Sequence, residues 1–202
     1  MHLLSFSFIL PLPDGQCVKL RKFLRCAQST VHKYIKTALT GGFLHDFSAA
    51  LNGADIFLDY AHTPDGLKTT LNSMRRICEG KLYCLFGCGG NREKEKRSVM
   101  GEISGVIADF TIITSDNPRY EDPCLIISEI EKGIRRVTRN YVTVSDRKSA
   151  LVYAISLLKD GDVLVVAGKG AENYQEIMGV KRDFSDEAEI RSAIARIEGE
   201  NS

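Results

Sequence analysis

The sequence predicts an α/β fold, with a Rossmann-like, mostly parallel sheet of about six strands and helices on both faces. From residue 54 onward, short apolar runs alternate with segments whose apolar residues recur at helical spacing, as in a βαβ series. The run Val163–Ala167 is the most apolar of these and is typical of a central strand. With 202 residues, 44% hydrophobic and 26% charged, the chain can bury a core as one globular domain plus a further segment.

The expected elements follow one another regularly along the chain. Pro64 suits the first turn of the first helix. Strands are expected at 56–60, 82–86, 109–114, 141–144 and 163–167, an edge strand at 180–184, and helices at 64–78, 98–107, 123–136, 148–158 and 186–197. Because the strands are parallel, ligands are expected beyond their carboxyl ends, at one edge of the sheet.

We expect residues 51–202 to form this domain and residues 1–50 to form a separate amino-terminal extension. The apolar run Leu3–Leu12 has no preceding Lys or Arg and no cleavage pattern, so a buried strand is favoured over a signal sequence. Residues 17–39 are basic, contain no acid and show helical apolar spacing, which predicts a basic amphipathic helix. Packing on the domain or on a neighbour is favoured for this helix, with a membrane surface or a nucleic-acid arm as alternatives.

Charge and cysteine content exclude several classes of protein. The net charge of +1 gives no global signal for nucleic acid, so no nucleic-acid partner is expected. The six cysteines lack CxxC spacing, which argues against a disulfide framework or a zinc site. We therefore expect a cytoplasmic protein without a resident metal.

Four polar loops follow the predicted strands: 59–65, 87–92, 116–119 and 168–172. Their glycines let backbone N–H groups approach a ligand, while Arg92 and Arg119 could each grip a carboxylate and the acids could hold an ammonium. Amino-acid recognition is the first hypothesis. Each loop also has a plain structural reading. Asp-Asn-Pro is a common turn, glycines turn the chain, Asp59 or His62 could cap the following helix or satisfy neighbouring backbone, and Glu172 could favour a helix start. Gly87-Cys88-Gly89 is a poor dinucleotide fingerprint.

In order and spacing, the motifs DYAHTPD (59–65), FGCGGNR (86–92), DNPR (116–119) and GKG (168–170) resemble the carboxyl-terminal domain of Mur ligases, over residues 54–198. The resemblance is greatest to the members that add meso-diaminopimelate to UDP-MurNAc-L-Ala-D-Glu in peptidoglycan biosynthesis. It implies an amide-forming ligase that uses ATP and Mg²⁺. ATP phosphorylates the glutamyl carboxylate, and the incoming amine then attacks the acyl phosphate.

The resemblance also implies residue roles. The residues implied to bind meso-diaminopimelate are Arg92, Asp116, Asn117, Pro118, Arg119, Gly168 and Glu172, and those implied to face the nucleotide are Asp59, Tyr60 and His62. Lysine lacks the second carboxylate of diaminopimelate. A buried Arg119 would then be left unpaired by lysine, which supports discrimination on the order of 10⁴.

The chain departs from the family pattern in several places. It contains no GxxxxGK[ST] phosphate loop, Phe47–Asn52 stands where a Gly-Arg-Met-Glu-like segment is usual, and Ala171 replaces the usual histidine. The central and uridine-nucleotide domains, and the modified lysine that helps to hold magnesium, are not recognised. We therefore expect no complete catalytic set, no tight ATP or Mg²⁺ binding and no activity from this chain alone. The alternative is a non-catalytic amino-acid-binding or regulatory module, or a truncated remnant of the ligase.

Overall fold

The computed structural model describes residues 9–11, 17–19 and 44–200. The chain divides into two compact units, residues 1–42 and 43–202. In the first unit, β1 (Ile9–Pro11) pairs antiparallel with β2 (Cys17–Lys19). β1 lies within the apolar run that was expected to hold a strand. A helix beginning at residue 17 is wrong, because Cys17–Lys19 pairs as a strand with β1, and residues 20–39 of that predicted helix lie outside the described residues.

A six-stranded sheet in the order β3-β4-β8-β5-β6-β7 forms the centre of the second unit. Its strands are β3 (Leu44–Leu51), β4 (Ala54–Asp59), β5 (Leu82–Phe86), β6 (Phe110–Thr114), β7 (Tyr141–Val144) and β8 (Val163–Ala167). All neighbours are parallel except β3, which pairs antiparallel with β4. The predicted fold class is confirmed, with β8 at the centre as expected. The domain was expected to start at residue 51, whereas the second unit starts at Phe43 and includes β3, which pairs with β4.

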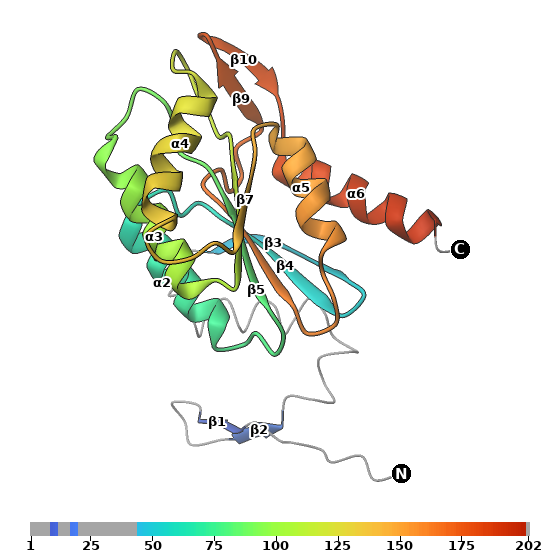
Figure 1. Ribbon diagram of the computed structural model, residues 1–202. Helices are drawn as coiled ribbons and strands as arrows, with labels where there is room; N and C mark the ends of the chain where they lie inside the picture. Colours follow the sequence, from blue (N-terminus) through green and yellow to red (C-terminus); the bar gives the residue numbers. More distant parts are fainter. Residues whose placement is uncertain (1–8, 12–16, 20–43, 201–202) are drawn as a thin grey trace. The chain divides into compact units, whose positions relative to one another are not determined.

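Helices cover both faces of the sheet (Figure 1). α2 (Pro64–Arg75), α3 (Glu95–Ile107) and α4 (Pro123–Ile134) pack on one face, and α5 (Arg147–Ser156) and α6 (Asp186–Glu200) on the other. Each face has its own core, centred on large apolar side chains such as Leu71, Met100 and Ile130 on the first face and Leu151, Leu164 and Ile190 on the second. The sheet is therefore buried on both sides, which explains why its central strands are continuous apolar runs.

Side-chain caps define the first residues of α2 and α4, which follow loops at the edge of the sheet. Thr63 caps α2 by accepting a hydrogen bond from the Gly66 N–H at 3.2 Å, and Asp122 caps α4 by accepting one from Cys124 at 2.8 Å. Each cap is followed by a proline in the first turn, where the missing N–H costs little. The cap of α2 is thus Thr63, so neither Asp59 nor His62 fills the capping role considered for them.

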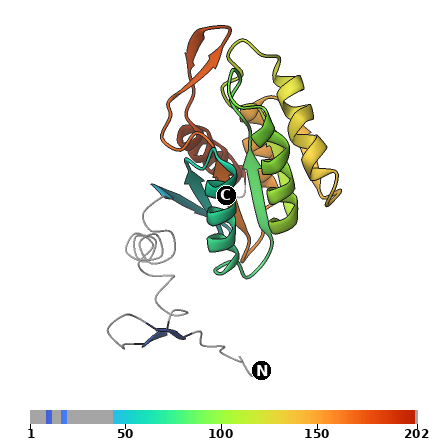
Figure 2. The ribbon, with the colours of Figure 1, turned by 90° about the vertical axis from the view of Figure 1, so that its left-hand side faces the viewer.

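A two-stranded hairpin follows β8. β9 (Tyr174–Ile177) pairs antiparallel with β10 (Val180–Asp183), and the two joining residues, Met178 and Gly179, have φ values of 51° and 74°. Two left-handed residues give the tight turn whose twist suits a hairpin. The strand expected at 180–184 is confirmed over Val180–Asp183, but it pairs with β9 in a separate hairpin and is not an edge of the six-stranded sheet. Figures 1 and 2 show the hairpin projecting beyond one end of the sheet.

Candidate functional site

The loops that follow β4, β5, β6 and β8 meet at one edge of the sheet. Gly168 N–H donates to Asp59 O at 3.0 Å, and Gly90 N–H donates to Asn117 O at 2.9 Å. Close approach requires glycine here, since a Cβ atom at Gly87 would overlap Thr114 O and one at Gly90 would overlap Pro118 O. The structure thus brings together the four loops that the sequence analysis selected.

The loop 116–119 is held against the β9–β10 hairpin by backbone hydrogen bonds. Arg119 N–H donates to Glu176 O at 3.0 Å, and Met178 N–H donates to Arg119 O at 2.6 Å. Asn117 Oδ1 accepts from Glu176 N–H at 3.0 Å. Arg119 has a φ of 52°, an uncommon conformation for a non-glycine residue. Asp-Asn-Pro-Arg is therefore more than a free surface turn, because a second element fixes its shape.

Two arginines from different loops lie beside Gly89. A Cβ atom built at Gly89 would lie 2.8 Å from Arg119 Nη1 and 3.7 Å from Arg92 Cγ. Arg119 donates from Nη1 to Gly90 O at 2.9 Å, and its Nε lies 3.4 Å from Glu176 Oε2. Its side chain is 21% exposed, and Arg92 is exposed. The expectation that Arg119 is buried is thus wrong, because the loop presents its side chain at the edge of the sheet.

Asp116 lies under the loop rather than on its surface. Its Oδ1 is shielded from solvent and has no hydrogen-bond donor among the described residues, while Lys169 Nζ is 3.7 Å away. Burial raises the pKa of this carboxyl, and the positive charges of Arg147 and Lys169 act in the opposite direction. In this conformation Asp116 is largely buried and balances internal cations.

Glu172 and Asn117 are joined to each other. Asn117 Nδ2 donates to Glu172 Oε2 at 2.8 Å, so the loop after β8 and the loop after β6 share a hydrogen bond. Lys169 Nζ lies 3.2 Å from the same carboxylate oxygen and is fully buried. Ala171, where the family usually has histidine, is exposed. Lys169 was not among the predicted site residues, although its position between two glycines after the central strand was a visible signal.

The predicted nucleotide-facing residues divide into one internal residue and two surface residues. Asp59 is buried, accepts hydrogen bonds from Ala61 N–H at 3.0 Å and from Thr70 Oγ1, and has a pKa raised by burial against those hydrogen bonds. Tyr60 is 52% exposed and packs edge-on against the exposed His62 ring, with centroids 4.8 Å apart. Tyr60 and His62 thus offer an aromatic surface, whereas Asp59 orders the loop from beneath.

Two fully buried arginines support the site and were missed by the sequence analysis. Arg147 forms a paired contact with Asp186 at 2.8 and 2.7 Å and donates to Ser115 O and Ala167 O, each at 3.2 Å. Ser115 directly follows β6 and Ala167 is the last residue of β8, so Arg147 connects the carboxyl ends of these two strands. Each arginine lies in the first turn of a helix, Arg97 in α3 and Arg147 in α5, and no local pattern indicates that it faces inward.

The second buried arginine is Arg97, which supports the loop after β5. It donates to Glu121 Oε2 at 2.9 Å, to Glu129 Oε2 at 2.6 Å and to Gly89 O at 3.1 Å. Hydrogen bonds from Arg97 and from Asn91 N–H lower the pKa of Glu121 to about 2. Arg97 thus fixes the loop that carries Arg92.

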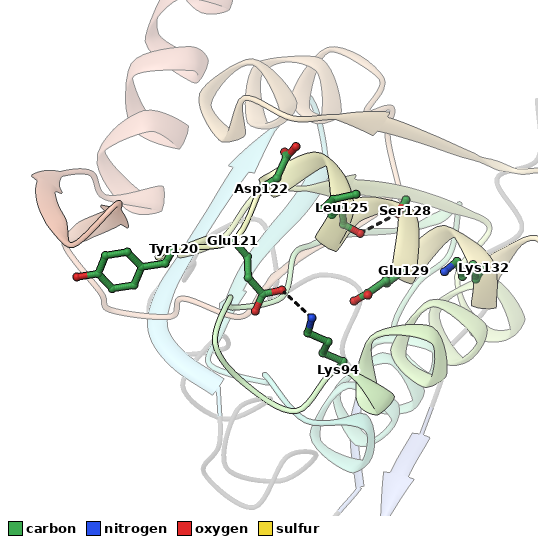
Figure 3. Close-up of a pocket in the computed structure, with 8 residues that line it drawn as sticks. All are labelled: Lys94, Tyr120, Glu121, Asp122, Leu125, Ser128, Glu129 and Lys132. Carbon is green, nitrogen blue, oxygen red and sulfur yellow. Dashed lines mark hydrogen bonds and ion pairs between the residues drawn. The ribbon is translucent and has the colours of Figure 1, made fainter.

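A surface pocket of about 380 Å³ lies next to this support (Figure 3). Its rim carries an ion pair between Lys94 Nζ and Glu121 Oε2 at 3.7 Å. The lining residues are Lys94, Tyr120, Glu121, Asp122, Leu125, Ser128, Glu129 and Lys132. It contains none of the predicted site residues, so the candidate site is the convergence of loops at the sheet edge and not this pocket.

Among the described residues, no three His, Cys, Asp or Glu side chains are grouped so as to hold a metal ion. No helix in that part of the chain is long and apolar enough to cross a membrane.

Comparisons with known proteins agree with the fold and the motifs. Residues 46–170 match the family "Mur ligase, glutamate ligase domain". The UDP-N-acetylmuramoyl-L-alanyl-D-glutamate–2,6-diaminopimelate ligase of Rickettsia bellii is 51% identical over 144 residues, which cover 70% of this chain and 30% of the relative. Its counterpart in Clostridium acetobutylicum is 52% identical over 138 residues, covering 68% and 28%.

Solved structures give the same result. A structure of a UDP-N-acetylmuramoyl-L-alanyl-D-glutamate–2,6-diaminopimelate ligase superposes with a TM-score of 0.73 at 38% identity, covering 78% of this chain and 32% of that one. A murein peptide ligase from Psychrobacter arcticus shares the fold, with a TM-score of 0.52 at 15% identity. The chain spans less than a third of the length of the curated relatives it matches. The family match over 46–170, the identity to the diaminopimelate ligases and the shared fold place this chain in the Mur ligase family, in its carboxyl-terminal domain.

Proposed function

We propose that this chain is the acceptor-binding domain of a ligase that adds meso-diaminopimelate to UDP-MurNAc-L-Ala-D-Glu in peptidoglycan biosynthesis. The observation that carries the proposal is the position of Arg92 and Arg119, from two separate loops, beside Gly89. The Glu172 carboxylate accepts a hydrogen bond at 2.8 Å from Asn117, which lies in the loop that carries Arg119. Two arginine side chains from one side and the Glu172 carboxylate from another loop suit a ligand end that carries both a carboxylate and an ammonium. The names of the relatives, which are diaminopimelate ligases, support the choice of acceptor.

The proposed binding mode uses the groups that a ligand can reach. Arg119 and Arg92 take the carboxylate at the far end of diaminopimelate, and Glu172 takes the ammonium there. Gly168, which has a φ of 109° and lies beside the Asp116 carboxylate, and the buried Asn117 keep the loop backbone close to the ligand. Because the far end is held, the other amine of the acceptor is presented beyond the sheet edge.

ATP and Mg²⁺ are proposed as cofactors of the ligase reaction and not of this chain alone. The sequence contains no GxxxxGK[ST] loop, and the buried Asp59 is occupied by Thr70 and Ala61. The described residues therefore suit neither the phosphates nor the metal, although the exposed Tyr60 ring could lie against a nucleotide base. We expect no ATP turnover when this chain is given ATP, the UDP-linked dipeptide and diaminopimelate, and measurable phosphate release would overturn that expectation. The cytoplasmic location stays a prediction.

The proposal is tested by whether Arg119 contributes more to the binding of meso-diaminopimelate than to the binding of lysine. We expect Arg119→Ala to weaken meso-diaminopimelate binding by about 10- to 100-fold, since a charge-assisted hydrogen bond contributes about 1.5–3 kcal/mol. Binding of L-lysine, which lacks the second carboxylate, should change less than about threefold. Isothermal titration of the full chain with each ligand measures both changes.

Arg196→Ala is the matched control, because Arg196 is exposed on α6, away from the four loops. It should leave both affinities unchanged. Equal losses for diaminopimelate and lysine in Arg119→Ala would show that Arg119 does not read the second carboxylate, and the assignment would fail.

A further inference from the structure

Lys169 occupies an unusual position for a lysine. It follows the central strand β8, lies between Gly168 (φ 109°) and Gly170 (φ 51°), and is fully buried. Lysine is almost never fully buried unless its charge is paired. Its ammonium group must therefore be held by acceptors inside the protein.

Four oxygen atoms surround that ammonium group. Lys169 Nζ lies 2.6 Å from Tyr174 O, 3.3 Å from Asn117 Oδ1 and 3.2 Å from Glu172 Oε2. Asp116 Oδ1 is 3.7 Å away. The contacts thus come from the loop after β6, the loop after β8 and the first residue of β9, which are the three segments that build the candidate site.

We propose that Lys169 is the positioning residue of the acceptor site: its buried ammonium group sets the relative positions of Asn117, Glu172 and β9, and so the geometry with which Arg119 and Glu172 meet a ligand. The proposal rests on the proposed function and names a further residue for it. Lys169 does not touch the ligand itself. It acts by fixing groups that do, in the way that a supporting shell of hydrogen bonds keeps a binding site at its productive geometry.

The charges around the ammonium group support this role. Asp116 faces Lys169 and also experiences the charges of Arg147 on α5, Glu172 after β8 and Asp186 on α6. Removal of Lys169 would take away one of the two cations named here as offsetting the burial of Asp116, which would raise the pKa of Asp116 further. The loop 116–119 would then lose both its hydrogen-bond donor and its charge balance.

A local positioning role and a general structural role of Lys169 predict different sites of faster amide hydrogen exchange when Lys169 is replaced. Arg119 N–H and Glu176 N–H are bonded across the site, whereas the amides of β5 and β8 belong to the core of the sheet. In Lys169→Met, which keeps most of the length of the side chain but removes its charge and donors, we expect faster hydrogen exchange at Arg119 and Glu176 and unchanged exchange in β5 and β8. This measurement needs no ligand. Unchanged exchange at Arg119 and Glu176, or equal acceleration throughout the sheet, would overturn the proposal.

The second measurement is the affinity for meso-diaminopimelate by calorimetry. Lys169→Met should weaken binding on the order of 10- to 100-fold, and the loss should be smaller in a Glu172→Gln background, because part of the effect of Lys169 passes through its contact with Glu172. Lys148→Met is the matched control, since Lys148 is exposed and pairs with Glu189 at 3.0 Å between α5 and α6. Unchanged affinity in Lys169→Met would overturn the positioning role. Failure of the unmodified chain to bind diaminopimelate would instead overturn the proposed function.

If Lys169→Met does not fold, an NMR titration of the unmodified chain tests the proposal instead. A buried, hydrogen-bonded ammonium group exchanges its protons slowly and can be followed by nitrogen-detected NMR. We expect the Lys169 signal to shift when the site is saturated with meso-diaminopimelate, and exposed lysines such as Lys148 to show no change. A Lys169 signal that does not move while binding is complete would contradict the proposal.

Discussion

The buried pair of Arg147 and Asp186 gives the sharpest prediction for stability. Both side chains are fully buried, and the two contacts at 2.8 and 2.7 Å form the paired geometry that satisfies arginine best. Replacement of Asp186 by leucine leaves the buried Arg147 charge without the carboxylate that pairs with it directly. We expect Asp186→Leu to lower the free energy of unfolding by about 3–5 kcal/mol.

The double variant Arg147→Met/Asp186→Leu should be less damaged than Asp186→Leu alone. It removes the stranded charge, and the remaining cost comes from Ser115 O and Ala167 O, which lose their donor. At about 1 kcal/mol for each carbonyl, the double variant should lose about 2 kcal/mol. The two substitutions are therefore expected to be strongly non-additive.

Urea unfolding followed by circular dichroism measures these differences. With a slope of about 2 kcal/mol per molar urea, the single variant should lower the midpoint by about 2 M and the double variant by about 1 M. A double variant at least as unstable as the sum of the two single variants would refute the reasoning, because it would show that the stranded charge is not the source of the loss.

Two further predictions concern α3, α4 and the loop above them. Gly133→Ala should destabilise the protein by about 1–3 kcal/mol, because a Cβ atom there would overlap Ser98 O where α3 packs on α4. Gly199→Ala in α6 is the control: its Cβ atom would meet nothing within 4 Å, so the change should be neutral or stabilising by about 0.5–1 kcal/mol. Thermal unfolding measures both differences. Glu121→Gln should destabilise the protein near neutral pH. Because hydrogen bonds from Arg97 lower the Glu121 pKa from 4.5 to about 2, the stability that its ionised form contributes is present above pH 4.5 and is lost as pH falls toward 2. Unfolding curves of the variant and the unmodified protein should therefore converge at acid pH, and a constant difference would argue against the ion pair.

The sequence was sufficient to predict the parallel series of strands and their shared edge. Val163–Ala167 and Leu82–Phe86 are continuous apolar runs, and the structure places both at the centre of the sheet, with the bounds that were expected. β3 was missed because its sequence, LHDFSAAL, mixes small and polar residues and shows no clean alternation. β9, with the sequence YQEI, was missed for the same reason, so Val180–Asp183 had no visible partner other than the main sheet.

The loop residues of the candidate site could be predicted from the sequence, whereas the contacts of the buried residues that support those loops could not. The motifs around Arg92, Arg119 and Glu172 could be read from topology, because the carboxyl ends of parallel strands meet. The partners of Arg147 and Lys169 could not. Asp186 lies 39 residues from Arg147, and Asn117 lies 52 residues from Lys169, so no local spacing links them.

The structure also changes the size of the selectivity that the sequence predicts. Discrimination on the order of 10⁴ requires an arginine that lysine leaves buried and unpaired. Arg119 is 21% exposed and already contacts Glu176 and Gly90 O, so it keeps partners and water when lysine binds. We therefore expect the preference for diaminopimelate over lysine to be about 10- to 100-fold in this chain.

That preference is the most direct test of the central claim, that the loops around Arg119 recognise an amino acid with a second carboxylate. Titration of the unmodified chain with meso-diaminopimelate and with L-lysine, under identical conditions, gives the ratio of the two dissociation constants. The account predicts saturable binding of meso-diaminopimelate and a dissociation constant for lysine that is about 10- to 100-fold larger. Equal affinities, or no binding of meso-diaminopimelate at millimolar concentration, would contradict it.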